Sequence, residues 1–300
     1  MARILVVEGN TPAVTEATLA VGGRPAAEQY AGVLVRLAGL SGVELAVRIE
    51  RPSFPGFEAG TVALDGLDGV ALTGSGVAWS ADAQQAREHR RLLERVFAAG
   101  LPVIGSCWGL QVGAVVLGGA VGASPEGLEL GVARHIRLTP AGRAHALHAE
   151  RADVFDAPCI HRDEVRRMPN GAVLTAWNDH SEVQAMVYEQ GGVRFWGMQY
   201  HPELGIDDCL RYASRGGPDA SFDRTKFENR AALLQVLSDF EAASAAPEAA
   251  APLAWRYGLR PELLDAGLRM AELAAWLDAV GVTAARRSAS RDATLPALHG

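Results

Sequence analysis

The feature that most constrains the fold is an alternation of short apolar runs and helix-like segments in the first half of this 300-residue chain. The apolar runs, typical of buried strands, are residues 2–8, 44–50, 69–73 and 101–105. The helix-like segments are residues 26–38, 82–99 (with Ser80 as a candidate N-cap) and 108–118. Such alternation predicts an α/β fold with an open, mostly parallel sheet and helices on both faces. A loop rich in Gly, Pro and Thr is expected between the first strand and about residue 25.

The second half of the chain has a different pattern, in which strand-like segments follow one another. These segments are residues 131–139, 153–160, 172–177, 183–189 and 193–200. Gly191 and Gly192 separate the last two segments and are typical of a tight hairpin turn. We therefore expect antiparallel strands added to the parallel core.

The composition changes near the C-terminus, where Ala, Ser, Pro and Glu predominate. Residues 242–252 are predicted to be a linker, followed by a helix that begins at Pro261 and a loose tail from about residue 284. We expect one domain over residues 1–241 and a linker with a helical extension over residues 242–300. The structural interpretation is that this helix packs on the parent domain. The functional interpretation is that it docks a partner.

Charge, hydropathy and cysteine content limit the function classes. With 28 Lys and Arg residues against 35 Asp and Glu residues, the net charge is −7, which argues against a nucleic-acid partner. The longest apolar stretch, residues 110–123, is shorter than the ~20 residues of a membrane helix, so no membrane partner is expected. The cysteines Cys107, Cys159 and Cys209 are too few for a disulfide framework, and these features together predict a cytoplasmic protein.

The strongest chemical signal is Gly105-Ser106-Cys107-Trp108-Gly109, which lies between a predicted strand and a predicted helix. A nucleophile on a sharp strand-to-helix turn needs small residues two positions before and after it, because the backbone crowds there. The turn also places Cys107 at a helix N-terminus, where the helix dipole stabilises a thiolate. The N–H of Trp108 can point at the same site as an oxyanion donor.

The second signal is His201-Pro202-Glu203 at the end of the last strand-like segment. Residues i and i+2 of an extended chain point to the same side, so Glu203 can orient the ring of His201. His201 could then take the proton of Cys107 and deliver it to a leaving amine. The cysteine and the histidine are 94 positions apart, so only the fold can bring them together.

Residues 105–111 (Gly-Ser-Cys-Trp-Gly-Leu-Gln) and 197–203 (Gly-Met-Gln-Tyr-His-Pro-Glu) resemble the two signatures of the class I, or triad, glutamine amidotransferases. The similarity is strongest to stand-alone proteins that resemble the glutaminase half of GMP synthase. It implies a flavodoxin-like fold, glutamine as the substrate, and a γ-glutamyl thioester that forms as ammonia leaves and is then hydrolysed to glutamate. It also implies that Cys107 is the nucleophile, His201 the acid and base, and Glu203 the orienting residue.

The resemblance, which extends over roughly residues 2–240, implies further site residues. Gln111 matches a position that helps to hold glutamine. The loop of Gly74, Ser75 and Gly76 matches the family's oxyanion loop, although Ser75 stands where a second glycine is expected and the usual proline is missing. Which N–H group of this loop serves stays open. His161 and Asp163 resemble a segment near the glutamine pocket, with a structural loop as the alternative.

No cofactor and no metal are expected. His135, His145 and His148 lie near one another in the sequence but lack a recognisable zinc-ligand spacing, and no phosphate-binding P-loop is present. The ATP-using synthetase half of GMP synthase therefore has no counterpart here, which suggests a separate synthetase partner that receives ammonia.

Three hypotheses for function remain at this point. The first is a glutaminase that supplies ammonia to a synthetase in trans. The second is a stand-alone hydrolase of another γ-glutamyl amide, which uses the same thioester chemistry with a different leaving amine. The third is a non-catalytic binding module that keeps the fold, against which the intact set of Cys107, His201 and Glu203 counts.

Overall fold

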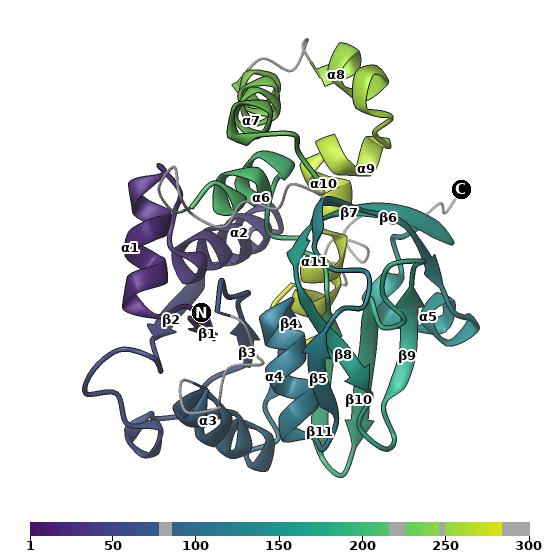
Figure 1. Ribbon diagram of the computed structural model, residues 1–300. Coiled ribbons are helices and arrows are strands. Elements are labelled where there is room, and N and C mark those ends of the chain that lie inside the picture. Colours follow the sequence, from purple (N-terminus) through teal and green to yellow (C-terminus); the bar gives the residue numbers. More distant parts are fainter. Residues whose placement is uncertain (78–85, 216–225, 246–249, 284–300) are drawn as a thin grey trace, which may run out of the picture.

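A computed structural model describes residues 1–77, 86–215, 226–245 and 250–283 of the chain. Its centre is a nine-stranded sheet with the order β2-β1-β3-β4-β11-β10-β9-β6-β7 (Figure 1). The parallel part contains β2 (Leu45–Glu50), β1 (Ala2–Val7), β3 (Gly69–Leu72), β4 (Pro102–Ser106) and β11 (Val193–Met198). Parallel strands of this kind place their carboxyl ends along one edge of the sheet, where ligands bind.

The remainder of the sheet is antiparallel, as the sequence predicts. It contains β10 (Ala185–Gln190), β9 (Val173–Trp177), β6 (Glu129–Leu138) and β7 (Val154–His161). Gly191 and Gly192, with φ of 60° and 82°, form the hairpin turn between β10 and β11 because both positions need positive φ. Two strands not foreseen from sequence, β5 (Ala120–Ala123) and β8 (Asp163–Arg167), pair as a small separate sheet.

Helices cover both faces of the main sheet (Figure 1). On one face, α2 (Ala26–Leu40) and α11 (Ala271–Ala279) bury Tyr30 and Trp276 in a core with Ile4 of β1. On the other face, α3 (Arg87–Ala98) and α4 (Trp108–Val116) bury Val96 and Leu110. The predicted α/β class, with a mostly parallel sheet between helices, is therefore confirmed. Short helical turns complete the fold at α5 (Pro140–Ala144), Ala59–Thr61 and Ala146–His148.

The predicted loop before residue 25 is wrong, because this segment contains α1 (Pro12–Ala20). Thr11 caps the helix through its side chain, which accepts a hydrogen bond from the Val14 N–H, and Pro12 occupies the first turn. The Thr-Pro pair is a start signal, but the segment lacks a clear apolar face that would reveal a helix. The predicted helix at 82–99 begins at Arg87, and Ser80 lies outside the described residues.

Beyond β11 the chain forms α6 (Ile206–Ala213), which sequence reasoning missed, and α7 (Arg230–Ala245). The predicted linker at 242–252 begins inside α7 and ends inside α8 (Ala250–Tyr257), with residues 246–249 outside the described residues. The single helix expected from Pro261 is divided into α9 (Pro261–Leu264), α10 (Ala266–Arg269) and α11. Asp265 is extended there and caps α10 with its side chain. The tail from residue 284, predicted to be loose, also lies outside the described residues.

The C-terminal helices pack into the parent domain instead of standing apart. Leu273, Trp276 and Leu277 belong to the same buried core as β1 and α2. Glu272 is fully buried and accepts hydrogen bonds from both Arg151 and Tyr200. The packing agrees with the first of the two interpretations of this segment.

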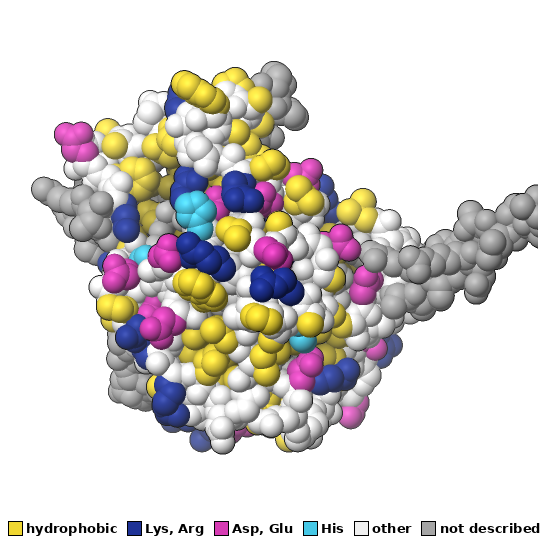
Figure 2. All heavy atoms as spheres, turned by 90° about the vertical axis from the view of Figure 1, so that its right-hand side faces the viewer, with side chains coloured by type: hydrophobic (Ala, Val, Ile, Leu, Met, Phe, Trp, Pro, Cys, Tyr) yellow, Lys and Arg dark blue, Asp and Glu magenta, His cyan; other side chains and the backbone are white. Residues whose placement is uncertain are grey.

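The surface gives no single strong charge signal on the face that Figure 2 shows. Acidic and basic side chains are interspersed there among hydrophobic ones. Within the described ranges, no helix combines the length and apolar character needed to cross a bilayer.

Candidate active site

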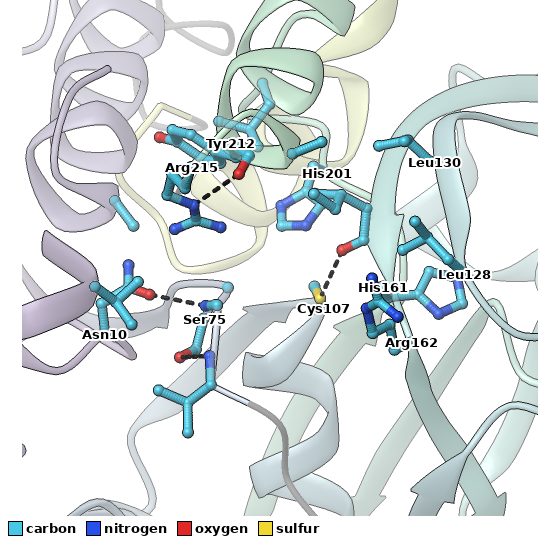
Figure 3. A pocket seen from close by; sticks show the side chains of 18 of the residues that line it. Asn10, Ser75, Cys107, Leu128, Leu130, His161, Arg162, His201, Tyr212 and Arg215 are labelled. Atoms are coloured by element: carbon cyan, nitrogen blue, oxygen red, sulfur yellow. Dashed lines mark hydrogen bonds between the residues drawn. The ribbon is translucent and has the colours of Figure 1, made fainter. Parts of the chain in front are cut away.

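The carboxyl ends of three neighbouring parallel strands, β3, β4 and β11, meet at one cavity. The loop after β3 carries Gly74 and Ser75, the turn after β4 carries Cys107, and the loop after β11 carries His201 and Glu203. All five residues line this cavity of about 460 Å³. Figure 3 labels three of them, Ser75, Cys107 and His201. The sheet order brings together residues that are far apart in the sequence, because β4 pairs with β3 on one side and β11 on the other.

Cys107 occupies a strained turn between β4 and α4. Its φ is 51° and its ψ is −107°, which is rare for a residue with a side chain. A Cβ on Gly105 would lie 2.6 Å from the carbonyl carbon of Gly109, and a Cβ on Gly109 would lie 2.5 Å from the Leu72 oxygen. The two glycines are therefore sterically required, which agrees with the expectation for a nucleophile elbow.

His201 and Glu203 lie on the same side of the chain after β11. The Nδ1 atom of His201 is 2.7 Å from Oε1 of Glu203, while the buried Nε2 atom has no hydrogen-bond partner among the described residues. Burial opposes the charge of the ring, but the Glu203 carboxylate and the Cys107 sulfur outweigh this effect and raise the pKa of His201 to about 10. At neutral pH the imidazole is therefore in its charged form, with a proton on Nδ1, which faces Glu203, and a proton on Nε2.

The loop after β3 has two of its N–H groups occupied. The Gly76 N–H donates to Oδ1 of Asn10 (2.8 Å), and the Val77 N–H donates to Oγ of Ser75 (3.0 Å). In the described part of the chain, the N–H groups of Gly74 and Ser75 make no such bond, so these two are the loop's candidates for an oxyanion donor. The serine at position 75 thus holds its own loop through its side chain and leaves its backbone N–H available.

Two further predicted residues lie beside Cys107. Trp108 is the first residue of α4. Its indole and the ring of His89 form a T-shaped pair with 4.6 Å between the ring centroids. Gln111 lines the cavity, but its Nε2 donates to the Asp163 carbonyl (2.7 Å) and to Oε1 of Gln199 (3.2 Å). Gln111 thus holds the wall formed by Asp163, and its direct role with a substrate stays a prediction.

His161 points into a polar network beside the cavity. Its Nε2 is 2.7 Å from Oε2 of Glu129, whose other oxygen accepts from Asn178. The pKa of Glu129 lies below its ordinary value. Burial acts to raise this pKa, but the effects that lower it, of which the hydrogen bond with His161 is the largest, outweigh burial. Glu129, His161 and His180 offer ligand atoms within 4.8 Å of one another. These hydrogen bonds account for the cluster as a structural network, and the expectation that the site needs no metal stays a prediction.

Sequence reasoning missed three polar residues that shape the cavity: Glu8, Asn10 and Arg215. Glu8 is buried and accepts from the Ala27 N–H and the Asn10 side chain. Asn10 connects Glu8 to the loop after β3, and Arg215 lines the cavity just after α6. Only Glu8 had a signal in the sequence that could have revealed it. It is an acidic residue that directly follows the apolar residues of β1, where a buried position is expected.

Comparison with known proteins agrees with the resemblance inferred from the two motifs. The family model described as glutamine amidotransferase class-I matches residues 33–207, which is more than half of the chain and includes both motifs. The chain belongs to the class I glutamine amidotransferase family. The resemblance inferred from the two motifs is thereby confirmed. This amidotransferase also matches a relative along nearly its whole length.

That relative is a γ-glutamyl-L-1-hydroxyisopropylamide hydrolase from a Pseudomonas species, 32% identical over 95% of each chain. A GMP synthase from Alcanivorax borkumensis is 38% identical, but over only 38% of this chain and 22% of that enzyme. Among solved structures, a glutamine amidotransferase from Methylobacillus flagellatus covers 93% of this chain and 95% of its own, with a TM-score of 0.61 and 19% identity. A glutamine amidotransferase from Thermotoga maritima covers 93% and 98%, with a TM-score of 0.54 and 16% identity. Both structures support the amidotransferase fold.

Proposed function

We propose that this amidotransferase is a stand-alone hydrolase that cleaves the γ-glutamyl amide of an organic amine through a thioester on Cys107. The observation that carries the proposal is the meeting of a cysteine in a strained elbow with the unpartnered Nε2 atom of a carboxylate-paired His201. The substrate class is supported by the hydrolase from Pseudomonas, because that match extends over 95% of both chains.

In the first half-reaction, the Cys107 sulfur attacks the side-chain carbonyl carbon of the γ-glutamyl group. The carbonyl oxygen becomes an oxyanion beside the N–H groups of Trp108 and Ser75, and the N-terminal end of α4 stabilises its charge. His201 gives its Nε2 proton to the amide nitrogen, the C–N bond breaks, and the free amine leaves. Because the pKa of His201 is about 10, the ring holds this proton at neutral pH and can transfer it to the leaving amine.

In the second half-reaction, water attacks the thioester. The Nε2 atom of His201, now neutral, takes a proton from the water, and the sulfur leaves as a thiolate. Glutamate is released, and the pair of Cys107 and protonated His201 is restored. Glu203 remains charged throughout and holds the ring in one orientation, as the third member of a triad does.

Supply of ammonia to a synthetase is the second candidate, because part of the chain resembles GMP synthases. That similarity accounts for 38% of this chain, against 95% for the hydrolase. The cavity of about 460 Å³ also lies within the range of about 300–1,000 Å³ that is typical of drug-sized ligands. A cavity of this size leaves room for an amine larger than ammonia, which favours the hydrolase.

The decisive experiment compares kcat/KM for free glutamine, γ-glutamylethylamide and γ-glutamyl-L-1-hydroxyisopropylamide, with Cys107→Ala as the control. We expect at least one substituted amide to exceed glutamine by about tenfold or more. Preference for glutamine would favour the ammonia-supplying enzyme instead. The absence of both turnover and a covalent adduct at Cys107 would leave the non-catalytic module.

A further inference from the structure

Arg215 lies on the wall of the active-site cavity opposite His161 and Arg162, with Cys107 between them (Figure 3). Its Nε donates to the Tyr212 carbonyl (2.8 Å), and its Nη1 donates to Oγ1 of Thr18 (3.1 Å). The guanidinium carbon lies 4.9 Å from the centre of the Tyr212 ring. Contacts from α1 and α6 therefore fix the orientation of the guanidinium group before any ligand enters.

The Nη1–Nη2 edge of this guanidinium group faces the loop after β3. A Cβ on Gly76 would lie 3.0 Å from both Nη1 and Nη2 of Arg215. Gly76 adjoins Ser75, whose N–H is a candidate oxyanion donor beside Cys107. The positive charge of Arg215 thus belongs to the reaction cavity and not to the outer surface.

Within the described ranges, Arg215 has no ion-paired carboxylate of its own. The two buried carboxylates on this side are already engaged, since Glu8 accepts from Asn10 and Ala27 and Glu203 accepts from His201. Burial lowers the pKa of Arg215, and the nearby Tyr212, Glu8 and Cys107 offset only part of this cost of desolvating the cation. A bound anion would remove that cost.

We propose that Arg215 binds a carboxylate group of the substrate. The inference rests on the proposed γ-glutamyl hydrolase activity, and it names the residue that recognises the acidic part of the substrate. Every γ-glutamyl amide carries the α-carboxylate of its glutamyl group, and the amide of an amino acid carries a second carboxylate on the leaving amine. The planar fork of an arginine matches a carboxylate with two parallel hydrogen bonds. Nη2, which makes no hydrogen bond within the described ranges, is available for such a pair.

The test uses two substrates that differ in the leaving amine. γ-Glutamylglycine has a carboxylate on the amine, and γ-glutamylethylamide has none. We expect Arg215→Gln to lower kcat/KM by about 10- to 100-fold, mainly through KM, with partial recovery in Arg215→Lys. Arg211→Gln is the matched control, because Arg211 lies in α6, four residues before Arg215, but pairs with Glu241 away from the cavity.

The pattern of loss identifies the source of the carboxylate. Equal loss for both substrates assigns Arg215 to the α-carboxylate, and loss for γ-glutamylglycine alone assigns it to the amine side; either result supports the proposal. Unchanged kcat/KM for both substrates in a stably folded Arg215→Gln protein would overturn it, while the hydrolase activity would stand.

Binding gives a second measurement that does not depend on turnover. In the Cys107→Ala background, we expect Arg215→Gln to weaken the calorimetric Kd for γ-glutamylglycine by about tenfold or more. An unchanged Kd would overturn the role of Arg215 even if the proposed reaction itself failed. Failure of the proposed function alone would appear as a wild-type protein that binds this ligand but forms no product and no adduct.

Discussion

The imidazole ring of His201 lies directly against the backbone of Gly74, so that a Cβ on residue 74 would be 2.5 Å from Cε1 of the ring. Side-chain atoms do not approach one another this closely in packed proteins. The contact joins two of the three loops that form the cavity, and it couples the position of the histidine to that of the predicted oxyanion loop.

Gly74→Ala should therefore displace either the ring of His201 or the loop. We expect kcat/KM to fall by about 100-fold, because a misplacement of about 1 Å in a catalytic group has an effect of this size. Gly32→Ala in α2 is the matched control, since a Cβ there meets nothing within 4 Å. Full activity in Gly74→Ala would contradict the close coupling of this loop to His201.

Cys107 should be the one cysteine that reacts with an electrophilic glutamine analogue. Burial raises the pKa of Cys159 and of Cys209 well above the usual value, so neither thiol forms a reactive thiolate near neutral pH. We expect intact mass spectrometry to find a single adduct, and Cys107→Ala to lose the adduct together with turnover. Labelling that persists in Cys107→Ala would show that another group is the nucleophile.

Glu203→Gln should shift the pH profile of the reaction. The Glu203 carboxylate is the leading effect that raises the pKa of His201 against the opposing effect of burial. Without it the pKa falls, so the protonated ring is lost at a lower pH and the alkaline limb of kcat/KM moves down by about one pH unit or more. We also expect a rate loss of about 100-fold, milder than that of Cys107→Ala. An unchanged alkaline limb would argue that His201 is not the group that titrates there.

Glu272→Gln should reveal how firmly the C-terminal helices are attached. Burial opposes the charge of Glu272, but Arg151 outweighs this effect and lowers the pKa of the carboxyl to about 2. Removing the charge leaves the buried Arg151 cation without its carboxylate partner, which costs about 3–5 kcal/mol of unfolding free energy at pH 7. Urea unfolding measures this loss, with the exposed Glu94→Gln as the control.

The same pair predicts a pH dependence of stability in the wild-type protein. The folded pKa of Glu272, about 2, lies below the ordinary value of 4.5, so its contribution is complete above pH 4.5. The contribution declines as the pH falls from about 4.5 toward 2. The difference in stability between wild type and Glu272→Gln should therefore shrink at pH 3, and a constant difference would contradict the assigned pKa.

Local sequence patterns were sufficient for the frame of the fold and for the core of the candidate site. Alternating apolar runs predicted the parallel strands, because β1, β3 and β4 are buried over most of their length and carry that burial in their own residues. The glycines around Cys107 and the spacing of His201 and Glu203 were readable for a similar reason. Their constraints act within five residues of chain, so they leave a mark in the local sequence.

The tertiary structure decided the parts that depend on distant neighbours. The separate pairing of β5 with β8, the docking of α11 through Glu272 and Arg151, and the exposure of Arg215 to the cavity have no local signature. Each depends on a contact between segments far apart in the chain, whose free energy comes from burial and pairing in the folded state. The residue type at one position does not reveal which distant segment it will contact. An arginine such as Arg215 would be solvated on a surface, and it becomes a candidate binding group only because the fold places it in a cavity.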